Sequence, residues 1–154
     1  MRAPLLVVLW VLLGFESLGG LVIFVARLAA GRTPGETLHV IGGLLLLLVY
    51  ALYQWRHWGR VAPLRARLDY GLGLLAAGSM VLVNATGVML GLEWWRDRIA
   101  DPITGEVAYT PLVSAIHNIA SMLVLTFAAG HLGAVLFRDQ RLRAARSARR
   151  PGRS

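Results

Sequence analysis

Four long apolar runs, separated by short polar links, decide what this chain can fold into. They cover about residues 4–26, 36–55, 69–92 and 111–137. Each run has about 20 residues or more, enough for an α-helix to cross roughly 30 Å of hydrocarbon. The runs do not alternate as the strands of a membrane barrel do. The sequence therefore predicts an all-α fold, a transmembrane up-down four-helix bundle with antiparallel neighbours.

Composition and charge fit a membrane protein better than a soluble one. Of the 154 residues, 56% are hydrophobic, which leaves little polar surface for a soluble domain. The net charge of +8 comes from arginines beside the apolar runs, so we expect a lipid bilayer and no nucleic acid as partner. We expect a transmembrane domain over residues 1–138 and a basic tail over 139–154.

Arginine also predicts the orientation of the chain. It is concentrated in the link 56–69 and in the tail, which lie on one face together with Arg2. By the positive-inside rule both chain ends are then cytoplasmic. A cleaved signal peptide is the alternative for the first run. Its apolar stretch is long for a signal peptide, and Arg27 precedes the best cleavage position, near Ala29.

The chain has no cysteine, which limits the redox cofactors that it can bind. Disulfides, thiolate-bound iron–sulfur clusters and covalently attached c-type haem are excluded. A metal cofactor would need histidine, carboxylate or methionine ligands. We found no nucleotide-binding loop, catalytic triad or zinc motif. All four histidines lie in or beside the second and fourth runs: His39, His57, His117 and His131.

The spacing of the histidines places them on shared helix faces. His117 and His131 are 14 residues apart, a rise of about 21 Å with a return to within roughly 40° of the same face. His39 and His57 are 18 apart, about five turns. The second and fourth helices of an up-down bundle run in the same direction. The histidines then pair at an outer and a cytoplasmic level, an arrangement suited to non-covalent b-type haem.

Small residues beside the histidines allow two interpretations. They leave room for the edge of a porphyrin, but they also let helices approach without a cofactor. They are Gly42, Gly43, Ala120, Ser121, Gly130 and Gly133.

The segments Leu38-His39-Val40-Ile41-Gly42-Gly43 and His117-Asn118-Ile119-Ala120, with His131 fourteen residues on, resemble the four-helix membrane cytochrome b families. These include the cytochrome b subunits of formate dehydrogenases and hydrogenases, and small bacterial proteins of the cytochrome b561 type. The resemblance implies one or two haem b groups and a place in a bacterial cytoplasmic (inner) membrane. It also implies respiratory electron transport beside other subunits of a redox complex, with quinone as a possible partner.

One departure from the family pattern leaves the haem count open. In many such proteins two parallel helices each carry histidines 14 residues apart, but the residue 14 after His39 is Tyr53, and His57 follows one turn later. Either His57 binds the inner haem with His131, or His39 and His117 hold a single haem. In the second case His131 is a remnant or a hydrogen-bonding residue.

Glu16 is the only acid deep inside a run, where a bare carboxylate is costly. It is either a proton relay to a quinone site or a structural acid bonded to another helix, for example at Asn84 or Thr86. Four arginines are candidates for contacts with haem propionates. Their alternative role is as topology signals: Arg32, Arg56, Arg96 and Arg98.

The sequence thus predicts a membrane cytochrome that carries electrons between an outer donor and a quinone or an inner partner. We expect an electron-transfer subunit of an oxidoreductase complex more than an enzyme acting alone, with the outer link 96–110 as a docking surface. Two rivals stay open. One is a haem-free anchor or assembly subunit with structural histidines, and the other is a small proton-coupled transporter that uses Glu16 and the histidines.

Overall fold

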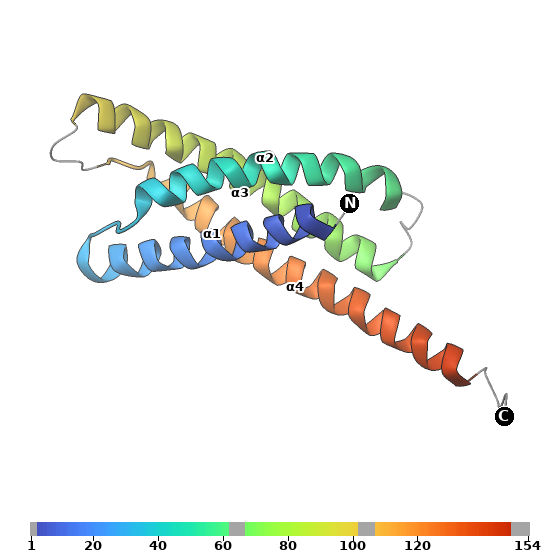
Figure 1. The fold of residues 1–154 in the computed structure, drawn as a ribbon. Helices are drawn as coiled ribbons and strands as arrows, with labels where there is room; N and C mark the ends of the chain where they lie inside the picture. The colour runs from blue at the N-terminus through green and yellow to red at the C-terminus, as the bar shows by residue number, and fades with distance from the viewer. Residues whose placement is uncertain (1–2, 62–66, 102–106, 149–154) are drawn as a thin grey trace.

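The computed structural model describes residues 3–61, 67–101 and 107–148 and folds them into four helices (Figure 1). In chain order they are α1 (Ala3–Ala30), α2 (Glu36–Val61), α3 (Leu68–Ala100) and α4 (Pro111–Ala148). The predicted all-α four-helix bundle is confirmed. Residues 139–148 of the predicted tail are helical, whereas Arg2 and residues 149–154 lie outside the described part of the chain.

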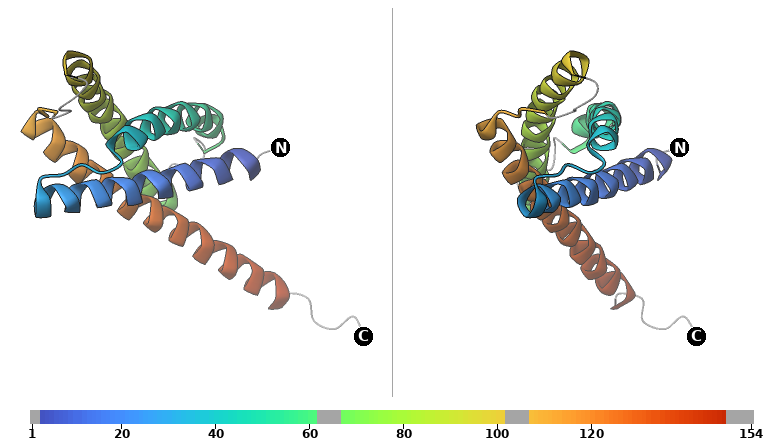
Figure 2. Two further views of the ribbon diagram at one scale, coloured as in Figure 1. Left: turned by 60° about the vertical axis from the view of Figure 1, so that its left-hand side comes forward. Right: turned by 90° about the vertical axis from the view of Figure 1, so that its left-hand side faces the viewer.

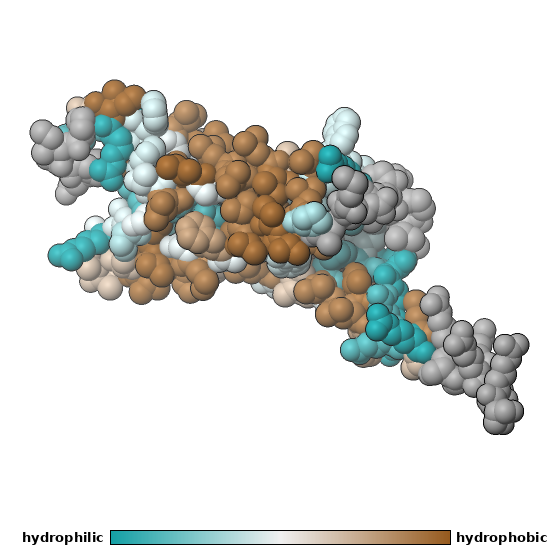
Figure 3. Space-filling view, in the orientation of Figure 1, coloured by the Kyte–Doolittle hydropathy of each residue, from teal (hydrophilic) through white to brown (hydrophobic). Residues whose placement is uncertain are grey.

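All four helices are long and apolar enough to span a membrane. Only 11% of the most apolar stretch of each helix is buried inside the protein, so most of the apolar side chains face outward. On the visible face, hydrophobic side chains form a broad belt with hydrophilic residues at its two ends (Figure 3). Such a surface is stable in lipid and not in water. The chain is a multi-pass membrane protein with four candidate spans.

Local sequence signals fix the link between α1 and α2. Gly31 takes a left-handed conformation, with φ of 64°, and its N–H donates to the carbonyl of Arg27 at 3.0 Å. This is a common way for a helix to end. Gly35, with φ of 75°, turns the chain into α2. Proline opens α4 at Pro111, a first-turn position where no N–H is needed.

The helices form two antiparallel hairpins. α1 packs on α2 and α3 packs on α4, while the contacts between the hairpins are fewer and lie mainly between α2 and α3. We call the end at which α2 and α4 begin the His117 end, and the end at which α2 finishes the His131 end. From the His117 end, α1 and α4 diverge, so that the described chain ends lie far apart (Figure 2).

A polar cluster joins the links and helix ends at the His117 end. The hydroxyl of Tyr109, just before α4, donates to Oε1 of Glu36 at 2.6 Å, and Arg98 of α3 reaches Oε2 at 3.5 Å. The guanidinium of Arg27, on α1, lies 5.4 Å from the centre of the Tyr109 ring. Burial, and then the hydrogen bond to Glu36, raise the pKa of Tyr109 above its ordinary value. The phenol therefore stays a neutral donor.

A second ionic cluster fixes α3 to α4 at the His131 end. Asp69, in the first turn of α3, pairs with Arg67 at 2.7 Å and with Arg138 of α4. An acid in this position is also favoured by the helix dipole. The first cluster joins both hairpins, and the second joins α3 to α4.

Candidate functional site

His39 of α2 and His117 of α4 face each other across the two hairpins. Their ring centres are 6.3 Å apart and their planes are inclined by 85°. Two imidazoles that each bind one metal through a bond of about 2 Å have ring centres roughly 6 Å apart. The separation of these two rings matches that value, and it is also within the range of an ordinary edge-to-face contact between two rings.

The Nδ1 atom of His117 is held by α3. It lies 3.2 Å from the carbonyl oxygen of Val83 and 3.0 Å from the hydroxyl of Thr86, which itself donates to the carbonyl of Leu82. Because a carbonyl only accepts, the contact with Val83 places a proton on Nδ1. The lone pair of the neutral ring is then on Nε2, the atom available to a metal.

The Nδ1 atom of His39 lies against a buried acid. It is 2.8 Å from Oε2 of Glu16, a side chain of α1 that is only 7% exposed. Within the described residues, neither Oε1 of Glu16 nor Nδ1 of His39 has a hydrogen-bond partner, so the two side chains are in close contact without hydrogen-bond geometry. The nearest polar side chain to Glu16 is thus on another helix, at His39, and both interpretations of this acid stay predictions. The suggested Asn84 and Thr86 do not fill that place.

The third ring, His131, repeats the pattern further along α4. Its Nδ1 lies 2.6 Å from the carbonyl oxygen of Asp69, at the start of α3. This contact again assigns the proton to Nδ1 and leaves Nε2 free to bind a metal. Three of the four histidines thus have Nδ1 beside an acceptor on the other helix of their hairpin.

Glycines on α1 and α3 make room for these rings. A methyl group at Gly20 would lie 3.2 Å from Cε1 of His39, and one at Gly87 would lie 3.2 Å from Cε1 of His117. At Gly73 it would lie 3.0 Å from Nδ1 of His131. From the sequence, Gly73 and Gly87 are expected only to permit close helix packing, and nothing in the neighbours of each histidine along the chain connects them or Gly20 with the rings. The signal was present, since Gly73 and Gly87 are 14 residues apart, like the two histidines of α4.

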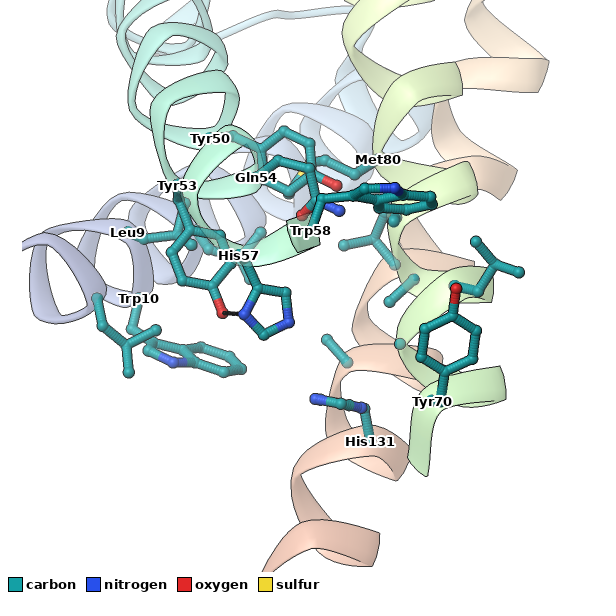
Figure 4. A pocket seen from close by; sticks show the side chains of 18 of the residues that line it. Leu9, Trp10, Tyr50, Tyr53, Gln54, His57, Trp58, Tyr70, Met80 and His131 are labelled. Atoms are coloured by element: carbon teal, nitrogen blue, oxygen red, sulfur yellow. Dashed lines mark hydrogen bonds between the residues drawn. The ribbon is translucent and has the colours of Figure 1, made fainter. Parts of the chain in front are cut away.

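At the His131 end, a pocket opens between the hairpins (Figure 4). His57 and His131 point into it from α2 and α4, with Trp10, Tyr70 and Met80 around them. The cavity measures about 160 Å³. The two histidines therefore share one space, as His39 and His117 do at the other end.

The structure places Tyr53 and His57 side by side in this pocket. Their rings are stacked, with centres 5.1 Å apart and planes inclined by 16°, and the Tyr53 hydroxyl lies 3.4 Å from Nδ1 of His57. Both side chains line the cavity. The extra turn between position 53 and position 57 does not take the histidine away from the pocket.

The four candidate arginines differ in their surroundings. Arg32 and Arg56 are exposed. Arg96 pairs with Asp97 at 2.8 Å, and Arg98 with Glu36 at 3.5 Å. Two of them thus have a carboxylate partner in the chain, and their contacts with haem propionates stay predictions.

The number of metal-binding side chains at each level limits which metal sites are possible. In the part of the chain that the structure describes, no three His, Cys, Asp or Glu side chains gather where they could hold a metal ion. A bare zinc site needs three or four protein ligands. The two histidines of each level fall short of that number, so a metal bound between them would need further ligands from outside the described residues.

No protein-family model, curated protein or solved structure matches the chain. The resemblance to membrane cytochromes b therefore rests on the residues of the two histidine segments.

Proposed function

We propose that this protein is a membrane electron carrier of the b-type cytochrome class, with haem held non-covalently between α2 and α4. The observation that carries the proposal is that histidines of these two helices lie in ring contact at one end of the bundle and line one pocket at the other. His39 and His117 have ring centres 6.3 Å apart, and His57 and His131 line one pocket. His39 and His117 would be the axial ligands at one level, and His57 and His131 at the other.

The chain prepares these ligands before any cofactor binds. Acceptors lie beside Nδ1 of His39, His117 and His131 and orient the rings, so that in the neutral ring the donor lone pair is on Nε2. The glycine opposite each ring lets the imidazole lie close to the neighbouring helix. A bound haem would supply reversible one-electron transfer at its iron.

The pocket must widen to accept a macrocycle. Its volume of about 160 Å³ is below the roughly 300–1,000 Å³ of typical ligand sites. Aromatic side chains occupy much of the space, Trp10 and Tyr70 among them. Because the hairpins contact each other less than their own helices do, parting the hairpins is the movement with the smallest loss of packing. The proposal requires that movement, or rotation of the aromatic rings.

Two levels of ligands suit transfer across the membrane. His117 and His131 are separated by 14 residues of one helix, a rise of about 21 Å. With the His131 end on the cytoplasmic side, electrons would pass between an outer donor and a quinone or protein partner inside. The protein would then serve as a subunit of a membrane oxidoreductase complex.

Absorption spectra of the purified protein test this proposal. We expect a Soret band and a reduced α-band of b type. His117→Ala and His131→Ala should each remove one haem, because each leaves its partner without the opposite ligand. Asn118→Ala, one residue from His117, is the matched control and should keep both. His57→Ala and Tyr53→Phe, compared with each other, decide which of these residues binds at the His131 end.

The same spectra separate the rival functions. A haem-free protein that is folded and in the membrane would overturn the cytochrome and favour an anchor or a proton-coupled transporter. Haem retained in both His117→Ala and His131→Ala would contradict the assigned ligands.

A further inference from the structure

The histidines of the two levels differ in the charge of the acceptor beside them. Nδ1 of His117 and Nδ1 of His131 lie against backbone carbonyls, those of Val83 and Asp69. Nδ1 of His39 lies 2.8 Å from a carboxylate oxygen of Glu16. A carbonyl is neutral, whereas a carboxylate brings charge next to the ring. Nδ1 is hydrogen-bonded in His117 and His131, whereas Nδ1 of His39 has no hydrogen-bond partner among the described residues and lies beside an acid.

The fold makes room for Glu16 at this place. A methyl group at Gly42, one turn after His39, would overlap Oε1 of Glu16, and one at Gly43 would lie 3.7 Å from Oε2. Gly20, one turn after Glu16, lies against the other side of the His39 ring. The carboxyl group is 7% exposed and sits in the apolar interior, where an acid without a partner is costly. Three glycines and one imidazole therefore define a site for this one carboxylate.

A carboxylate beside a ligand imidazole changes the reduction potential of the metal that the ring binds. Its negative charge, 2.8 Å from Nδ1 of His39, polarises the ring and makes Nε2 a stronger electron donor. Its negative charge, in surroundings of low dielectric constant, also favours the more positive metal centre. Both effects stabilise the oxidised form over the reduced form and so lower the reduction potential.

Resting on the proposed function, we propose that Glu16 is a positioning residue that lowers the reduction potential of the haem held by His39. Nδ1 of His131 lies 2.6 Å from a backbone carbonyl and not from a carboxylate oxygen, so we expect Glu16 to act on the haem held by His39. The two haems then differ in reduction potential, which gives electron transfer along the bundle a preferred direction.

Potentiometric titration of the purified, haem-loaded protein tests this inference. Glu16→Gln keeps the size of the side chain and removes its charge. We expect the midpoint potential of one haem to rise by at least about 59 mV, which corresponds to a tenfold change in the ratio of oxidised to reduced form for one electron. The other midpoint should not move. A purely structural role for Glu16 would alter stability or haem content without this selective shift.

Glu36→Gln is the matched control. Glu36 is also a buried glutamate at the His117 end, but its carboxylate is bonded to Tyr109 and Arg98, and among the described residues no hydrogen bond or ion pair joins it to a histidine. It should leave both midpoints in place. An equal shift in Glu36→Gln would show that any negative charge at this end suffices and would overturn the role of the Glu16–His39 contact.

A second variant tests the inference in case Glu16→Gln loses its haem. If Glu16→Gln releases the haem at this end, Gly42→Ala, which keeps the carboxylate but displaces it, must raise the same midpoint for the inference to stand. Haem-bearing variants with unchanged midpoints overturn the inference and leave the proposed function in place. A wild-type protein without haem overturns both.

Discussion

Gly73 and Gly87 are separated on α3 by the same 14 residues that separate His131 and His117 on α4. Because the two helices are antiparallel, equal spacing brings each glycine opposite one ring. Each position therefore matters for how the neighbouring imidazole is seated, more than for the backbone conformation of α3.

Gly73→Ala should disturb the site at the His131 end. Its new methyl group would lie 3.0 Å from Nδ1 of His131, a ring already held by the carbonyl of Asp69. We expect an overpacking cost of about 1–3 kcal/mol and loss of one haem in pigment analysis. Gly78→Ala on the same helix meets open space and is the control. Equal haem content in both variants would contradict the assigned packing.

At this scale the sequence predicted which histidines share a helix face, because their spacing follows helix geometry alone. Their roles as ligands stay predictions. The sequence did not predict the neighbour of Glu16 or the glycines beside the rings. Those contacts depend on how α1 rotates against α2, and α3 against α4, which hydrophobic patterning does not specify when most side chains face lipid.

Helix limits show what an apolar run can and cannot predict. The runs located all four spans, but each helix is longer than its run, and α4 reaches Ala148. Hydropathy marks the part of a helix that sits in lipid, whereas a helix ends where a breaker occurs. Gly31 gave such a signal for α1. Arginine and alanine, frequent in the last part of α4, are good helix formers and give none.

The cluster at the His117 end should contribute measurably to the stability of the helix ends. In Tyr109→Phe, Glu36 loses a 2.6 Å hydrogen bond while remaining buried. Hydrogen bonds to charged groups contribute about 1.5–3 kcal/mol, so the unfolding temperature should fall in circular dichroism. Tyr70→Phe is the control, since its hydroxyl has no hydrogen-bond partner among the described residues. Identical unfolding temperatures would contradict this role.

Across the whole molecule, short links predicted antiparallel neighbours, and the two hairpins confirm it. The divergence of the hairpins was not predicted. It depends on contacts between elements distant in sequence, and in a membrane protein those contacts give little pattern, because lipid and protein are both apolar. The divergence has a consequence for the site, since it opens the pocket that His57 and His131 share.

Orientation in the membrane can be measured with single cysteines, because the chain has none of its own. By the positive-inside rule we expect the link before α4 outside the cell and the end of α4 inside. A membrane-impermeant maleimide should label Ala108→Cys in intact spheroplasts, and Gln140→Cys only after lysis. Both positions are exposed in the structure. The reverse labelling would invert the positive-inside assignment, and labelling of both in intact spheroplasts would refute the spans.

The ratio of haem to protein in the purified wild-type chain tests the central claim most directly. Two pairs of histidines, one in ring contact and one lining a shared pocket, predict two b-type haems per chain. Acidic acetone should release both intact, because no cysteine can bind them covalently. One haem would restrict the site to the His39–His117 pair. A folded chain with no haem would contradict the account.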